Sequence, residues 1–214
     1  MKYWKPQEML SVLAEAKKVS ARNHLLVLLA YKHGLRASEL CRLTLNDVRD
    51  GRLDCKRLKG SLHTNRPLEC DENVLLDEKR ALAAYLRERI AGPEDQFLFT
   101  GRVSLEARRR MAASRASKRA DRQLNHAPVT GISRFTVTDV FEDACFKAGI
   151  ERGRRNPHLA KHTLGALAYR AGVDIVTLQQ LLGHRDPKST LCYTHLTQDE
   201  AHAKARSAMS AVFA

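Results

Sequence analysis

The segment HLAKHT, residues 158–163, places a lysine between two histidines. His158, Lys161 and His162 stand at helical spacings of three and four, so on a helix they share a face. A metal-free reaction on a phosphodiester needs cations for the non-bridging oxygens, an acid for the departing oxygen and a nucleophile. Lys161 can supply a cation and a histidine can move a proton. The segment therefore indicates phosphate chemistry, with a capped helix around a core histidine as the alternative.

A second cation and its support stand in GLRASEL, where Arg36 precedes Glu39 by three positions. A guanidinium can grip a phosphate through two parallel hydrogen bonds, and Glu39, one helical turn on, is placed to orient it. A surface arginine at an ordinary helix start is the alternative. Lys59, in the polar stretch LKGSLHTNR, is a third cation, at a point where one strand should pass to the next.

The nucleophile candidate is in LLGHRDPKSTLCYTHL, where His184 follows Gly183 and Tyr193 lies nine residues later. A tyrosine hydroxyl has an ordinary pKa near ~10 and needs help to react at neutral pH. Taken alone, Tyr193 could equally be an aromatic side chain at a helix end, packed on the core.

Neither a metal nor a cofactor is expected. The pair His158 and His162 lacks the glutamate of an HExxH zinc site, and no other acidic ligand is close in the sequence. The five cysteines include no CxxC pair, so they indicate reduced thiols rather than a zinc site or a disulfide framework.

The charge of the chain favours a polyanionic partner. The 214 residues carry a net charge of +13, and nucleic acid is the commonest partner of such a protein, although a merely basic protein is the alternative. Eight basic residues fall within 102–122. Six of these are candidate DNA contacts, unless the stretch is a solvated helix or a disordered loop: Arg108, Arg109, Arg110, Arg115, Lys118 and Arg119. With no signal peptide and no apolar run near the ~20 residues of a membrane span, we expect a cytoplasmic, nucleoid-associated protein and no membrane partner.

The elements that must hold these residues are mostly helices. Apolar spacing predicts helices over 6–18, 21–33 (ending at Gly34), 72–90, 136–149, 159–171, 174–182, 187–193 and 198–212. Between them, a hairpin signal at Asp50-Gly51 and strand candidates around Leu53–Cys55 and Arg66–Cys70 predict a small antiparallel sheet. The fold class is therefore α+β, mainly α.

As a set and in this order, these motifs resemble the tyrosine recombinase (phage integrase) family, over residues from about 30 to 205. The stretches ARNHLLVLLAYKHGLRASELCRL and RLKGSLHTNRPL are especially similar to the short recombinases that invert fimbrial promoter switches. The resemblance implies one catalytic domain over 1–214, with a basic insertion at about 102–127 and a tail helix at about 198–214.

The resemblance also implies the reaction and its residues. Tyr193 would attack the scissile phosphate and form a 3′-phosphotyrosyl link, with no cofactor. Arg36 would hold the non-bridging oxygens, His158 would be the acid/base group, Lys59 would protonate the leaving 5′-oxygen, and His184 would donate a hydrogen bond to the phosphate. The family has an arginine where this chain has Lys161. Lysine keeps the charge but loses the fork, so the enzyme could be slowed.

Implied partners are double-stranded DNA with specific recombination sites, three further copies in a homotetramer, and an accessory DNA-bending or core-binding protein. The reaction would be inversion, integration or excision. Two alternatives remain: a catalytically impaired DNA-binding or architectural protein, and a type IB topoisomerase that relaxes supercoils as a monomer.

Overall fold

The computed structural model describes residues 2–58, 61–89, 96–100 and 131–194, with five further positions in the tail, 202, 205, 206, 209 and 210. Its helices are α1 (Pro6–Val19), α2 (Ala21–Lys32), α3 (Ala37–Leu40), α4 (Glu78–Glu88), α6 (Arg134–Lys147), α7 (Pro157–Arg170), α8 (Ile175–Leu182) and α9 (Lys188–Leu191). Two short 3-10 helices, η1 (Leu45–Asp47) and η2 (Arg152–Arg154), and two strands, β1 (Arg52–Cys55) and β2 (Thr64–Pro67), complete the described elements. The predicted mainly α fold with a small antiparallel sheet is confirmed.

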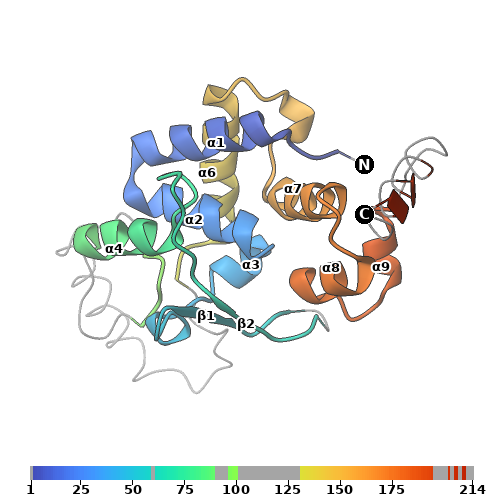
Figure 1. Cartoon of the computed structure of the whole chain (residues 1–214). Helices are drawn as coiled ribbons and strands as arrows, with labels where there is room; N and C mark the ends of the chain where they lie inside the picture. The colour runs from blue at the N-terminus through green and yellow to red at the C-terminus, as the bar shows by residue number, and fades with distance from the viewer. Residues whose placement is uncertain are drawn as a thin grey trace, which may run out of the picture.

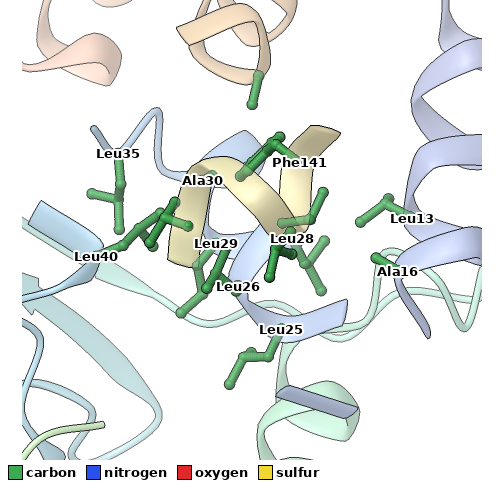
Figure 2. Close-up of a cluster of buried hydrophobic side chains, with 14 of the residues drawn as sticks. Leu13, Ala16, Leu25, Leu26, Leu28, Leu29, Ala30, Leu35, Leu40 and Phe141 are labelled. Carbon is green, nitrogen blue, oxygen red and sulfur yellow. The ribbon is translucent and has the colours of Figure 1, made fainter. Parts of the chain in front are cut away.

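The core forms around α2. Residues 23–30 of this helix are buried because α1, α4, α6 and α7 pack against it. Figure 2 shows its leucines beneath Phe141 of α6, with Leu13 of α1 to one side. Gly34 follows α2 with φ of 58°, the left-handed conformation predicted for the end of this helix. The chain turns there and delivers Arg36 to the start of α3.

The N-terminal segment is tied to α7 by Trp4. Its indole stacks on Phe141 at 6.4 Å between ring centroids, and its backbone N–H donates to Thr163 Oγ1 at 3.0 Å. The indole N–H donates to the carbonyl of Arg154 at 3.1 Å. These contacts fix α7 against the core, so the residues on its other face have a defined position.

The sheet differs in part from the prediction. β1 pairs with β2 antiparallel, Arg52 opposite Pro67 and Cys55 opposite Thr64. Asp50 and Gly51 do adopt positive φ, but they connect η1 to β1, so the hairpin predicted there is wrong. The connection between the paired strands is residues 56–63 instead. A two-stranded sheet is marginal alone, and Leu53 and Cys55 of β1 anchor this one by burial in the core.

The predicted start of α4 is wrong, and α6 is shifted by two residues from its prediction. α4 begins at Glu78 rather than at 72, because Asp77 caps it by accepting from the Arg80 N–H and residues 72–76 form turns. α6 covers 134–147 instead of 136–149, because the Ser133 hydroxyl caps its start and Gly149, with φ of 73°, follows its end. Most of the predicted tail helix over 198–212 lies outside the described residues. No helix in the described ranges is long and apolar enough to cross a membrane.

Candidate active site

The site begins on α7, whose capping fixes where the HLAKHT residues point. Asn156 accepts from the Leu159 N–H and Pro157 occupies the first turn, a common start for a helix. His158 is exposed, and His162, one helical turn later, is partly buried. Both border a pocket of about 240 Å³ lined by Lys2, Gly153, Asn156, His158, Leu159 and His162.

Lys161 points from α7 toward the end of α8. Its side chain is buried, with the residue 7% exposed, and its ammonium donates to the carbonyl oxygen of Leu182 at 2.9 Å. Burial, and then the positive charges of Arg57 and Arg36, lower the pKa of Lys161 to about 7, against the opposing effect of Glu39. Lys161 is therefore a cation that is only partly charged at neutral pH in the DNA-free protein.

Arg36 is held by Glu39 at the start of α3. The Glu39 carboxylate accepts from the Arg36 backbone N–H at 2.8 Å and from Nη1 at 3.0 Å. Nη1 also donates to Ser61 Oγ at 2.9 Å and to the Leu58 carbonyl at 3.3 Å. The opposite edge of the guanidinium, Nε and Nη2, makes no hydrogen bond to any residue the structure describes. That edge can donate hydrogen bonds to phosphate oxygens.

Arg57 connects the parts of the site, and the sequence analysis missed it. Its fully buried guanidinium donates at 2.9–3.0 Å to the carbonyls of His33, Gly34 and Leu182, at the ends of α2 and α8. Nε makes no hydrogen bond to a described residue, but it lies 3.5 Å from Glu39 Oε2, within ion-pair distance. The available signal was alternation: Leu53, Cys55 and Arg57 are two apart, so an extended chain turns all three inward.

Replacing Arg57 with methionine should destabilise the fold strongly. The carbonyls of His33 and Gly34 would lose the donor that the structure describes for them, whereas the Leu182 carbonyl would keep Lys161. Each unsatisfied buried group costs ~1–3 kcal/mol, so we expect the free energy of unfolding to fall by at least ~2 kcal/mol. Denaturant unfolding measures this, with Arg87→Met on the exposed surface of α4 as the matched control, expected within ~0.5 kcal/mol of wild type. Equal losses in the two variants would contradict this role of Arg57.

The end of α8 organises the remaining partners. Gly183 has φ of 65°, and its carbonyl accepts from the Leu62 N–H at 3.0 Å, so residues 61–63 extend to this turn (Figure 1). The next residue, His184, is hydrogen-bonded through Nδ1 to the buried Thr190 hydroxyl at 3.0 Å. Burial, then the charges of Lys161 and Arg36, lower the pKa of His184 to about 4. His184 is therefore neutral at pH 7, with Nε2 as its second polar atom.

Tyr193 follows α9 and packs on α7. It is 8% exposed, and its hydroxyl is hydrogen-bonded to His162 Nδ1 at 3.1 Å. The ring lies directly over Gly165, where a Cβ atom would be 2.5 Å from Tyr193 Cζ. Burial raises the pKa of Tyr193 above its ordinary value, and Cys192 adds to this. The candidate nucleophile is thus a neutral phenol in contact with His162 and Gly165, two residues the sequence analysis did not assign to it.

Several predicted site residues lie outside the described ranges. These are Lys59 and the six basic residues Arg108, Arg109, Arg110, Arg115, Lys118 and Arg119. Lys59 is close along the chain to residues that are described, since Leu58 N–H donates to Glu39 Oε1 at 3.0 Å and Ser61 contacts Arg36. The roles predicted for all seven stay predictions.

The described geometry brings Arg36, Lys161, His184 and Tyr193 to one region bounded by α3, α7 and the end of α8. Cations with a free hydrogen-bonding edge can hold an anionic phosphate, and a hydroxyl beside a neutral imidazole can be a nucleophile. Among the described residues, no group of histidine, cysteine or carboxylate side chains could hold a metal ion.

Comparison with known proteins finds relatives over most of the chain. Residues 2–200 match the sequence model of the phage integrase family. The type 1 fimbriae regulatory protein FimE of Escherichia coli K12 is 30% identical over 176 residues, 81% of this chain and 74% of FimE. The tyrosine recombinase XerC of Bacillus pumilus is 28% identical over 195 residues, 90% of this chain and 55% of XerC.

Solved structures share the fold. The XerA recombinase superposes with a TM-score of 0.68 at 23% identity, covering 97% of this chain and 65% of that one. XerH bound to its difH substrate gives 0.68 at 20% identity, over 96% and 54%. A lambda integrase tetramer bound to a Holliday junction gives 0.59 at 18%, over 92% and 50%. The chain thus spans less than two thirds of each of these three structures.

Proposed function

Because the chain belongs to the phage integrase family of tyrosine recombinases, we propose that it is a site-specific recombinase that breaks and rejoins duplex DNA at paired sites. In the proposed reaction the Tyr193 oxygen attacks the scissile phosphorus. The bond from phosphorus to the 5′-oxygen breaks, leaving a 3′-phosphotyrosyl link and a free 5′-hydroxyl. The phosphoester bond is conserved in the protein link, so no cofactor is needed.

The remaining groups have separate roles in this proposal. Arg36 holds non-bridging oxygens through its open edge, while Glu39 fixes its other edge. Lys161 adds a second positive charge, and His184 Nε2 donates a hydrogen bond to the phosphate. Lys59 protonates the leaving oxygen and His158 acts in acid/base transfer. One observation carries the proposal: a tyrosine hydroxyl hydrogen-bonded to the helix that also carries Lys161, in a chain whose family model match spans residues 2–200.

The domain and partner assignments follow from the same family. We infer one catalytic domain over 1–214 that acts on double-stranded DNA with specific sites, with 102–127 as a basic insertion and 198–214 as a tail helix. The lambda integrase structure is a tetramer on a Holliday junction, and XerH is bound to its difH site. Those assemblies support a homotetramer here. An accessory DNA-bending or core-binding protein is a further inference from the family resemblance. The recombination would be inversion, integration or excision.

A catalytically impaired DNA-binding protein is the second candidate. Two observations favour it: the Lys161 ammonium is engaged by the Leu182 carbonyl, and Tyr193 is buried with a raised pKa. Covalent capture of DNA separates the two functions, because a binding protein forms no phosphotyrosyl link. The test is incubation with nicked suicide duplexes from the genomic neighbourhood of its gene, without metal, followed by denaturing electrophoresis. The proposed function predicts a denaturant-resistant adduct.

Lys161→Arg should speed capture, and more so as the pH rises. The pKa of Lys161, lowered to about 7, means that its charge is present below pH 7 and lost above it, whereas an arginine stays charged. At subsaturating DNA, where the rate reports the free enzyme, we expect the wild-type rate to fall as pH rises through this range, and Lys161→Arg to be ~10-fold faster at pH 8. Rates that are equal or lower, from a variant with unchanged thermal stability, would show that the lysine is no handicap.

A further inference from the structure

Among the described residues, His162 alone is hydrogen-bonded to the Tyr193 hydroxyl, and His158 is not. His158 is exposed at the start of α7, and no hydrogen bond joins it to Tyr193 within the described structure. His162 is partly buried, its ring centroid is 6.1 Å from that of Tyr193, and the two rings are tilted by 52°. The imidazole therefore meets the phenol at its oxygen rather than by stacking on its face.

We propose that His162 is a further catalytic residue, which holds the Tyr193 hydroxyl and takes its proton when the nucleophile attacks. This inference rests on the proposed function and changes one assignment within it. His158 lines the pocket as an exposed residue, and His162 contacts the nucleophile directly. In the tautomer with its hydrogen on Nε2, His162 Nδ1 accepts from the hydroxyl.

The surroundings of His162 keep it neutral until DNA is bound. Burial, and then the charges of His158 and Lys161, lower its pKa below the ordinary value, so Nδ1 is free to accept at neutral pH. Lys2 lines the same pocket and His184 lies close enough to interact electrostatically. A bound phosphodiester brings a negative charge among these cations. That charge favours the protonated imidazole, so His162 becomes a better base when substrate is present.

The Tyr193 oxygen forms its bond to phosphorus while its proton passes to His162 Nδ1. The bond from phosphorus to the 5′-oxygen breaks, and its electron pair stays on that oxygen, which takes a proton from the acid of the proposed mechanism. On rejoining, the 5′-hydroxyl returns its proton to the group that supplied it and attacks phosphorus. The bond from phosphorus to the Tyr193 oxygen breaks, and protonated His162 gives its proton to that oxygen. The pocket beside His162, about 240 Å³, gives the imidazole contact with solvent.

Three variants separate proton transfer from positioning. His162→Asn keeps a hydrogen-bonding atom near the place of Nδ1 but cannot take a proton at neutral pH. His162→Gln moves that atom away, and His162→Ala opens space beside the pocket. We expect each to slow single-turnover capture by about a hundredfold or more, the usual size of a lost acid/base contribution. We also expect the acidic limb of the wild-type pH–rate profile to disappear, and added imidazole to restore part of the rate of His162→Ala.

A second substrate identifies which proton transfer is lost. A suicide duplex with sulfur in place of the bridging 5′-oxygen has a thiol leaving group, with a pKa near ~8.5, that needs no acid. The defect of the His162 variants should persist on it, because the nucleophile must still lose its proton. Relief of the defect by sulfur would make His162 part of the acid and overturn the inference.

Two further outcomes separate the role of His162 from the proposed function. If the wild-type chain forms a Tyr193-dependent adduct and His162→Asn or His162→Ala forms it at the wild-type rate, the role of His162 is overturned while the proposed function stands. If the wild-type chain forms no adduct, the proposed function fails and the role of His162 with it. Thermal unfolding of each variant checks that it is folded, and the unfolding of His162→Asn should stay close to that of wild type.

Discussion

Tyr193→Phe should abolish covalent capture of DNA and leave DNA binding unchanged. Phenylalanine keeps the ring that packs over Gly165 and removes only the oxygen that would bond to phosphorus. The lost hydrogen bond to His162 should lower the free energy of unfolding by no more than ~0.5–1.5 kcal/mol, so the variant stays folded. Denaturing electrophoresis measures capture, and a gel-shift titration at fixed salt measures binding.

The phenylalanine variant also distinguishes the candidate functions. A recombinase loses all adduct while its DNA affinity stays constant, whereas an architectural protein shows the same binding and no adduct in either form. Full adduct formation by Tyr193→Phe would place the nucleophile on another residue. A topoisomerase would lose supercoil relaxation in the same variant, and relaxation of plasmids without a specific site would favour that alternative.

Gly165→Ala should also produce a large loss, through position alone. The added Cβ would stand 2.5 Å from Tyr193 Cζ and 2.6 Å from Cε1, so the ring must move and its hydroxyl must leave His162. A misplacement of about 1 Å can cost a hundredfold in rate, and we expect a loss of that order in single-turnover capture.

The same substitution has two opposed effects on stability. Alanine is a better helix former than glycine by ~0.5–1 kcal/mol, but displacing the buried Tyr193 ring costs ~1–3 kcal/mol of packing, so we expect a modest fall in the melting temperature with a cooperative transition retained. Loss of the cooperative transition would mean general damage to the fold. Unchanged capture in a stable variant would mean that the position of Tyr193 over α7 does not matter for the reaction.

Much of the frame of the site was predictable from local patterns. Gly34 marked the end of α2, and the helical spacing of 159–171 and 174–182 located α7 and α8 to within two residues. These features depend on neighbours along the chain, which a sequence displays directly. The α4 boundary was wrong because apolar spacing alone extended the helix past its cap at Asp77.

The contacts between distant segments were not predictable in the same way. His162 was recognised only as a possible metal partner of His158, because its contact with Tyr193 joins positions 31 apart in the sequence. Arg57 joins β1 to the ends of α2 and α8, with Leu182 lying 125 positions away. Such contacts follow from the packing of the helices, and the residue types alone do not specify them.

Lys161 illustrates the same point for electrostatics. From the sequence it is a lysine in place of the family's arginine, with its charge retained. In the fold it is buried beside Arg57 and Arg36, so part of that charge is lost at neutral pH. The consequence for rate depends on pH, which the substitution alone did not reveal.

The central claim is tested most directly by locating the DNA attachment in a trapped adduct. The wild-type adduct, formed without metal on a suicide duplex, is digested with protease and nuclease, and the nucleotide-bearing peptide is sequenced by mass spectrometry. We predict a nucleotide joined through its 3′-phosphate to Tyr193. Attachment to any other residue, or through a 5′-phosphate, would contradict the proposed reaction.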